Sequence, residues 1–132
     1  SNLTVMETGG MKGRRQEIVR EELHEILCSG LGVSKIHSEY GMTELLSQAY
    51  SCGNGVFKTP SWMKILTREI SDPLSLCKEH KTGGINVIDL ANISSCCFIS
   101  TQDLGRTLGN NQFEIIGRFD NSDTRGCNLM IG

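Results

Sequence analysis

The spacing of apolar residues changes at Gly41, and this change constrains the fold more than any other feature of the sequence. Residues 14–28 place isoleucine, valine and leucine on one face at the 3.6-residue period of a helix. On either side of them, residues 3–7 and 33–40 have the short, apolar pattern of strands. The opening of the chain is therefore predicted to form a strand, a helix and a second strand, with the two strands parallel.

After Gly41 the pattern becomes that of strands. Residues 45–60 are polar and contain glycine, so they are predicted to form a loop. From Trp62 onward, segments rich in β-branched and aromatic residues alternate with turn signals. These segments are SWMKILTREI, GINVIDLANI, SCCFISTQDLG and QFEIIGRFD. The sequence thus predicts an α+β fold in two parts, a β-α-β start in residues 1–44 and a small antiparallel, β-barrel-like unit in residues 45–132.

Composition excludes several classes of protein. A chain of 132 residues with 38% hydrophobic and 21% charged residues has the balance of a globular domain. Its net charge of −2, with acids and bases interspersed, does not suit a nucleic-acid surface. No apolar run approaches the ~20 residues of a membrane helix. Since the sequence has no secretory signal, a cytoplasmic protein is expected, with its six cysteines as free buried thiols.

Two polar clusters follow the predicted strands of the first part. Gly9 and Gly10 would let the backbone lie close to a ring or a phosphate, although, taken alone, the pair is better explained as a simple turn from strand to helix. In the second cluster, Tyr40 could stack on a base and the Thr43 hydroxyl could contact a phosphate oxygen. The Glu44 carboxylate could hold Mg²⁺, which takes oxygen ligands. The alternative is that Tyr40 lies in the core and Glu44 begins a helix.

Two more clusters lie at strand ends in the second part. Asp103 could accept both hydroxyls of a ribose, or close its own turn. Arg118 suits a phosphate or a ribose, or a surface ion pair. Cys127 follows an arginine and a glycine near the chain end, where a thiol is expected to be accessible and activated; the alternative is a buried, inert thiol like the other cysteines. Cys77 and His80 have a metal-ligand spacing but make only half of a zinc site.

Taken in order, the four clusters resemble successive motifs of the adenylate-forming ligase superfamily. The sequences around Asp103 and Arg118 are most similar to the acyl-protein synthetase family, which activates fatty acids for bacterial luciferase systems. The matching motifs are Thr8-Gly9-Gly10, Tyr40-Gly41-Met42-Thr43-Glu44, Thr101-Gln102-Asp103 and Gly117-Arg118-Phe119-Asp120.

The resemblance implies a role for each matching residue. Gly9, Gly10 and Tyr40 would surround the adenine, and Asp103 and Arg118 would reach the ribose or a phosphate. Thr43 would contact the α-phosphate and Glu44 would coordinate Mg²⁺. Cys127 would accept the acyl group. The resemblance thus implies that the cofactor-binding residues are Gly9, Gly10, Tyr40, Asp103 and Arg118. It implies that the catalytic residues are Thr43, Glu44 and Cys127.

The resemblance also implies substrates and partners. ATP with Mg²⁺ would activate a carboxylic acid, such as a fatty acid, for transfer to a thiol acceptor. The superfamily's phosphate loop is absent from the sequence, so we expect it upstream of residue 1, where a further ligase segment or a second copy would cover the exposed edge. Two alternatives remain open. The chain could be an ATP-independent acyltransferase that uses Cys127, or an interaction module without catalysis.

Overall fold

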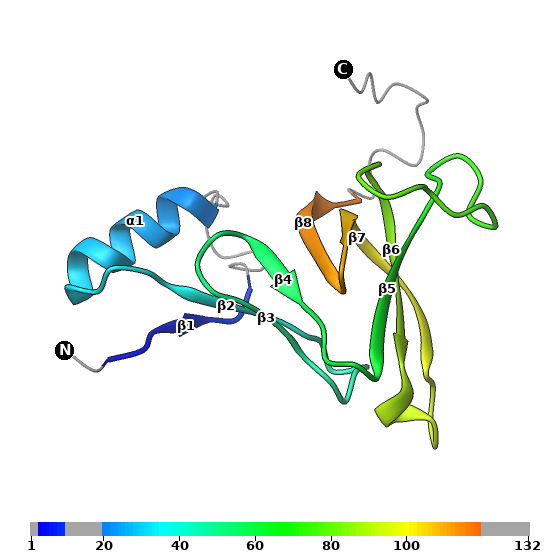
Figure 1. Ribbon diagram of the computed structural model, residues 1–132, viewed down its shortest axis with the longest axis horizontal. Helices are drawn as coiled ribbons and strands as arrows, with labels where there is room; N and C mark the ends of the chain where they lie inside the picture. The colour runs from blue at the N-terminus through cyan, green and yellow to red at the C-terminus, as the bar shows by residue number, and fades with distance from the viewer. Residues whose placement is uncertain (1–2, 10–19, 120–132) are drawn as a thin grey trace.

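A computed structural model describes residues 3–9 and 20–119 of the chain. In these ranges the chain forms one α-helix and eight strands (Figure 1). In chain order they are β1 (Met6–Glu7), α1 (Arg20–Leu31), β2 (His37–Tyr40), β3 (Ala49–Ser51), β4 (Val56–Lys58), β5 (Met63–Arg68), β6 (Gly83–Asp89), β7 (Phe98–Gly109) and β8 (Gln112–Arg118). A short 3₁₀ helix, η1 (Leu90–Asn92), follows β6.

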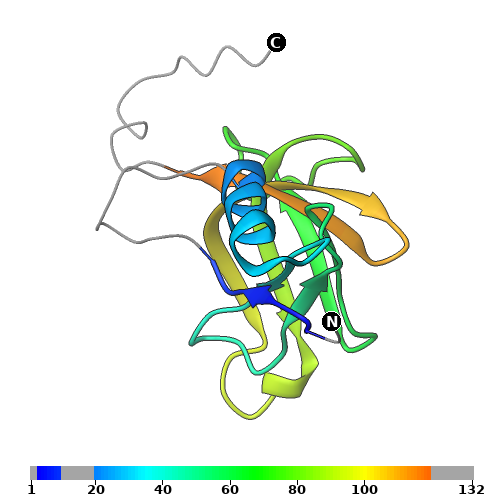
Figure 2. The ribbon, with the colours of Figure 1, turned by 90° about the vertical axis from the view of Figure 1, so that its left-hand side faces the viewer.

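All eight strands belong to one mixed sheet, in the order β1-β2-β3-β4-β8-β7-β6-β5. The β1–β2 pair is parallel, and every other pair in the sheet is antiparallel. The parallel pair confirms the predicted β-α-β opening, with α1 beside β1 and β2 in both Figure 1 and Figure 2. The sheet runs without a break from the first part of the sequence into the second, because β2 pairs with β3 and β4 pairs with β8.

Two expectations about the second part are wrong. Residues 45–60 are not a loop, since they contain β3 and β4, which pair with each other and join β2 to β8. The unit is also not a barrel. In the described part of the chain β1 and β5 remain at opposite edges of the sheet, which bends at irregularities in β6 and β7 but stays open.

Three aromatic rings form the centre of the core, on the inner face of the bent sheet. Phe57 and Phe113 are cross-strand partners with ring centroids 5.5 Å apart, and Tyr40 packs edge-on against both. The full cluster is Tyr40, Leu45, Ala49, Phe57, Met63, Ile65, Ile85, Val87 and Phe113. Burial alternates along β5, as the period-2 pattern predicted.

Element ends follow the local chemistry of the sequence. At the end of α1, Gly32 has a positive φ of 64° and the Val33 amide donates to the Cys28 carbonyl at 3.2 Å, which is the helix-ending arrangement expected there. Between β7 and β8, Asn110 and Asn111 both have positive φ, so a two-residue turn connects the strands. Leu108-Gly109-Asn110-Asn111 is one of the turn signals that separate the strand-like segments of the sequence.

The expectation that the cysteines are buried is wrong for the described part of the chain. The five cysteines described there are free, and each is exposed or half-buried. Cys96 and Cys97 lie directly before β7, and neither side chain is buried. The described residues contain no group of three or more histidine, cysteine or acidic side chains placed to hold a metal ion. Cys127 lies outside the described residues.

Candidate functional site

The candidate site begins at the carboxyl ends of the two parallel strands. The last register pair is Glu7 with Ser38, so the residues that follow β1 and β2 leave the sheet at the same edge. Gly9 follows β1 with a φ of 93°, and among residues 3–9 and 20–119 no atom outside its chain neighbours lies within 4 Å of the position that a Cβ would take. Its backbone is therefore open to an approaching group, in a conformation that favours glycine. Gly10 lies outside the described residues.

Glu7 fixes this strand end through its carboxylate. The Gly9 amide donates to Glu7 Oε2 at 2.8 Å, and Arg20 Nε lies 3.6 Å from Glu7 Oε1. Burial raises the pKa of Glu7, but hydrogen bonds from Ser38 and Gly9, the charge of Arg20 and a hydrogen bond from His24 together lower it below the ordinary value. The negative charge at this end of α1 is therefore retained at neutral pH.

His24 lies on the side of α1 that is turned toward the two parallel strands. Its side chain is only 13% exposed. Its Nε2 lies 3.5 Å from Glu7 Oε1 and 3.3 Å from Ser38 Oγ. The ring thus joins α1 to both parallel strands.

Three of the predicted site residues meet at one carboxylate. The Tyr40 hydroxyl donates to Asp103 Oδ2 at 2.8 Å, and Arg118 Nε lies 3.2 Å from Asp103 Oδ1. Asp103 and Arg118 are cross-strand partners on β7 and β8, whereas Tyr40 ends β2. The bend of the sheet therefore brings together side chains from three separate segments.

Exposure to solvent increases from Tyr40 through Asp103 to Arg118, as expected at the rim of a binding site. Tyr40 is 8% exposed, and its ring packs against Phe57 and Phe113. The Asp103 side chain is 14% exposed and that of Arg118 is 58% exposed. Burial and the neighbouring Asp103 charge raise the pKa of Tyr40 far above its ordinary value of 10.0, so its hydroxyl stays a donor at any physiological pH. The stacking of Tyr40 on a base stays a prediction.

Thr43 and Glu44 form an exposed turn that leaves the carboxyl end of β2. The Leu45 amide donates to the Met42 carbonyl at 3.0 Å, which closes the turn, and Leu45 itself is buried in the core. Neither the Thr43 hydroxyl nor the Glu44 carboxylate forms a hydrogen bond or an ion pair with residues 3–9 or 20–119. Glu44 therefore lies in a turn, not at the start of a helix.

Two polar residues that the sequence analysis did not single out, Asp89 and Asn92, contact the backbone just after this turn. Asn92 Nδ2 donates to the Glu44 carbonyl at 2.9 Å. Asp89 Oδ2 accepts from the amides of Leu46 at 2.9 Å and Ser47 at 2.8 Å. The available signal was a carboxylate and an amide three residues apart at the end of an apolar strand, but spacing alone does not identify their partners.

The fold is shared with solved structures of adenylate-forming ligases. The chain is 15% identical to an ATP-bound chimera named RpMatB-BxBclM B3, with a TM-score of 0.60 over 87% of this chain and 25% of that one. A benzoate CoA ligase from Burkholderia xenovorans LB400 is 15% identical, with a TM-score of 0.54 over 86% of this chain and 25% of that one. A structure from a study of fatty acyl-adenylate ligases from E. coli and L. pneumophila is 15% identical, with a TM-score of 0.53 over 87% of this chain and 28% of that one.

These likenesses show that the chain has the fold of part of an adenylate-forming ligase. The chain spans only about a quarter of the length of the structures that it matches. No protein-family model matches the sequence, and comparison with curated proteins gives no significant match. Among the described residues, no helix is long and apolar enough to cross a membrane.

Proposed function

We propose that this chain is the nucleotide-facing part of an ATP-dependent ligase of the acyl-protein synthetase type. Such a ligase activates a carboxylic acid, such as a fatty acid, as an acyl-adenylate and passes it to a thiol. The observation that carries the proposal is the meeting of Tyr40, Asp103 and Arg118, from three segments, within a fold that adenylate-forming ligases share. The finer assignment to acyl-protein synthetases rests on the sequence resemblance.

The Asp103 carboxylate has the acceptor capacity that a ribose would need. A carboxylate offers about four acceptor positions, two on each oxygen. Tyr40 occupies one position on Oδ2, and Arg118 faces Oδ1. One position on each oxygen therefore remains for the two hydroxyls of a ribose. Arg118, which is more exposed, can also reach a phosphate oxygen.

The exposed turn supplies the groups for the phosphate end of the substrate. The Glu44 carboxylate is a hard oxygen ligand, is exposed and has no described ion-pair partner, so it fits Mg²⁺. Bound there, Mg²⁺ would neutralise phosphate charge while the substrate carboxylate attacks the α-phosphorus and pyrophosphate leaves. The Thr43 hydroxyl would donate to an α-phosphate oxygen. Gly9 would leave space for the adenine beside β1.

The remaining parts of the reaction are assigned to segments of the ligase fold outside the matched quarter. Helix α1 supports this assignment, because none of its residues is buried and it exposes Ile26 and Leu31 at 54% and 48%. Apolar side chains exposed on one element are often covered by a partner. We propose that a further ligase segment covers α1, and that the thiol acceptor lies with that segment or at Cys127.

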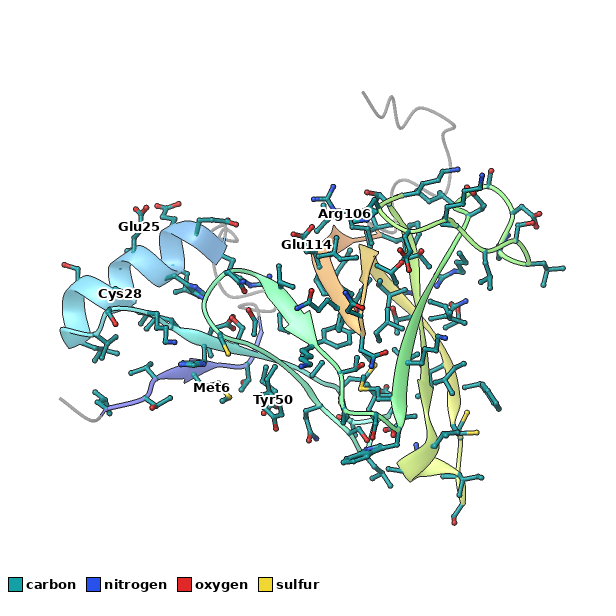
Figure 3. The ribbon with its side chains drawn as sticks, viewed as in Figure 1. Met6, Glu25, Cys28, Tyr50, Arg106 and Glu114 are labelled. Carbon is teal, nitrogen blue, oxygen red and sulfur yellow. The ribbon has the colours of Figure 1, made fainter. Side chains whose placement is uncertain are left out.

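Binding of AMP by the purified chain tests the proposal. Calorimetry in the presence of Mg²⁺ should detect binding, and Arg118→Ala should weaken it about tenfold, because a charge-assisted contact is lost. The matched control is Arg106→Ala. Arg106 pairs with Glu114 at 2.7 Å on the same two strands, and Figure 3 shows the two side by side.

The outcomes separate the three functions. AMP binding that is weakened by Arg118→Ala and unaffected by Arg106→Ala supports the ligase. If the unmodified chain does not bind AMP, the ligase proposal fails. Transfer of a labelled acyl group to Cys127 would then favour an ATP-independent acyltransferase, and its absence would favour an interaction module.

A further inference from the structure

The backbone that follows the Thr43–Glu44 turn is held by two buried side chains from the end of β6 and from η1. Asp89 is completely buried and Asn92 is 8% exposed. Asn92 contacts the carbonyl of Glu44, and Asp89 contacts the amides of Leu46 and Ser47, so the backbone is fixed on both sides of Leu45. We call this pair, Asp89 and Asn92, the clamp.

The Asp89 carboxylate of the clamp is fully hydrogen-bonded. Asp89 Oδ1 accepts from the Ser47 hydroxyl at 2.7 Å and from the Ala91 amide at 3.1 Å, in addition to the two amides on Oδ2. All of its roughly four acceptor positions are therefore used. No cation among residues 3–9 and 20–119 pairs with it, so neutral donors alone stabilise this buried charge. Trp62 Nε1 also donates to the Ser47 hydroxyl at 2.9 Å.

Asn92 completes the clamp from the next turn of chain. Its Nδ2 group donates both to Glu44 and, at 3.0 Å, to the Cys96 carbonyl, which lies just before β7. The clamp therefore joins the segment between β2 and β3 to the segment between β6 and β7. A buried and fully satisfied polar network of this kind restricts the backbone more tightly than apolar contact does.

The turn itself has no comparable support. Thr43 and Glu44 are exposed, and their side chains have no hydrogen-bonding partner in the described part of the chain. The direction in which they project is consequently set by the backbone that joins them to Leu45 and Ser47. That backbone is what the clamp holds.

We propose that Asp89 and Asn92 are positioning residues, which hold the Thr43–Glu44 turn in the orientation that contacts the phosphate and Mg²⁺. This inference rests on the proposed function. It predicts an effect on the phosphate end of the substrate and none on the ribose end, because no hydrogen bond in the described part of the chain joins the clamp to Asp103 or Arg118.

Asn92→Ala is the test variant, and Asn54→Ala is the matched control. Asn54 Oδ1 accepts from the Val56 amide at 3.1 Å and from Ser51 Oγ at 3.3 Å, so it also holds a turn, between β3 and β4, away from Thr43 and Glu44. NMR titration of the labelled full chain measures the affinity for adenosine and, separately, for AMP with Mg²⁺. Amide hydrogen exchange at Leu46 and Ser47 reports the local order of the backbone.

Asn92→Ala should bind AMP with Mg²⁺ about fivefold more weakly, bind adenosine as before, and speed exchange at the two amides. Asn54→Ala should change none of these. Equal loss for both ligands, or no loss for either, would overturn the inference while leaving the nucleotide site intact. If Asn92→Ala does not fold, Ser47→Ala gives the same test, because it removes one donor to Asp89 and keeps both amides. Failure of the unmodified chain to bind either ligand would overturn the proposed function and this inference with it.

Discussion

Replacing Tyr40 with phenylalanine removes one hydrogen bond and almost nothing else. The ring keeps its edge-on contacts with Phe57 and Phe113, at centroid distances of 6.0 and 5.4 Å, and only the 2.8 Å bond from the hydroxyl to Asp103 is lost. A hydrogen bond to a charged group contributes about 1.5–3 kcal/mol. Asp103 retains Arg118 and some exposure to water, so we expect the lower end, about 1.5 kcal/mol, or a fall of about 5 °C in Tm.

The same variant carries a signature in pH. The pKa of Tyr40 is raised in the folded chain, chiefly by burial and then by Asp103, above the ordinary value of 10.0 that it has when unfolded. Its contribution to stability is therefore complete below about pH 10 and decreases progressively as the pH rises toward the folded pKa, because only the unfolded chain ionises in that interval. The free energy of unfolding should fall by up to about 1.4 kcal/mol per pH unit from this residue alone, and Tyr40→Phe should not show this fall.

Urea denaturation from about pH 8 to about pH 11 measures both effects. The control is Tyr50→Phe, since Tyr50 is 46% exposed on β3 (Figure 3) and its hydroxyl has no hydrogen-bond partner among the described residues. The control should stay within about 0.5 kcal/mol of the unmodified chain. The reasoning is refuted if Tyr40→Phe matches the control at pH 8, or if its difference from the unmodified chain is the same at both ends of the range.

Two further predictions concern other elements. Burial raises the pKa of Asp89, but hydrogen bonds from Ser47, Leu46 and Ala91 outweigh burial and lower it. The contribution of Asp89 to the free energy of unfolding is therefore present above about pH 4 and is lost as the pH falls through the folded pKa. Asp89→Asn should cost about 2 kcal/mol at neutral pH and should reduce the fall in stability at acid pH, which urea denaturation measures. Asn111 has a φ of 60° in the β7–β8 turn. Asn111→Gly should raise the free energy of unfolding by about 0.5 kcal/mol, and Asn111→Val should lower it by more than about 1 kcal/mol. Equal effects of the two changes on Tm would contradict the turn assignment.

The start of the fold could be predicted because its signals are local. Helical spacing in residues 14–28 and Gly32 past the helix indicated a strand, a helix and a parallel strand. The short strands β3 and β4 could not be recognised, since each has only three residues. Ser51, a polar residue, is buried on β3 because its neighbours in the sheet cover it, and no local pattern indicates that.

The site shows the same division. Tyr40 and Asp103 lie 63 positions apart in the sequence, and only the resemblance to a ligase connected them before the structure was known. In the sequence, Asp89 and Asn92 have the pattern of the polar end of a strand. Their backbone partners lie in the segment between β2 and β3, 42 positions away in the case of Asp89 and Ser47. Long-range hydrogen bonds of this kind depend on how the sheet bends, which periodicity does not determine.

An NMR titration of the labelled chain with AMP and Mg²⁺ tests the central claim most directly. The account predicts that the largest shifts fall on Gly9, Tyr40, Asp103 and Arg118. Arg106, which lies further along the same hairpin toward its turn and pairs with Glu114, should be unaffected. Shifts that are absent throughout, or that centre on Arg106 and leave Asp103 and Arg118 unchanged, would contradict the account.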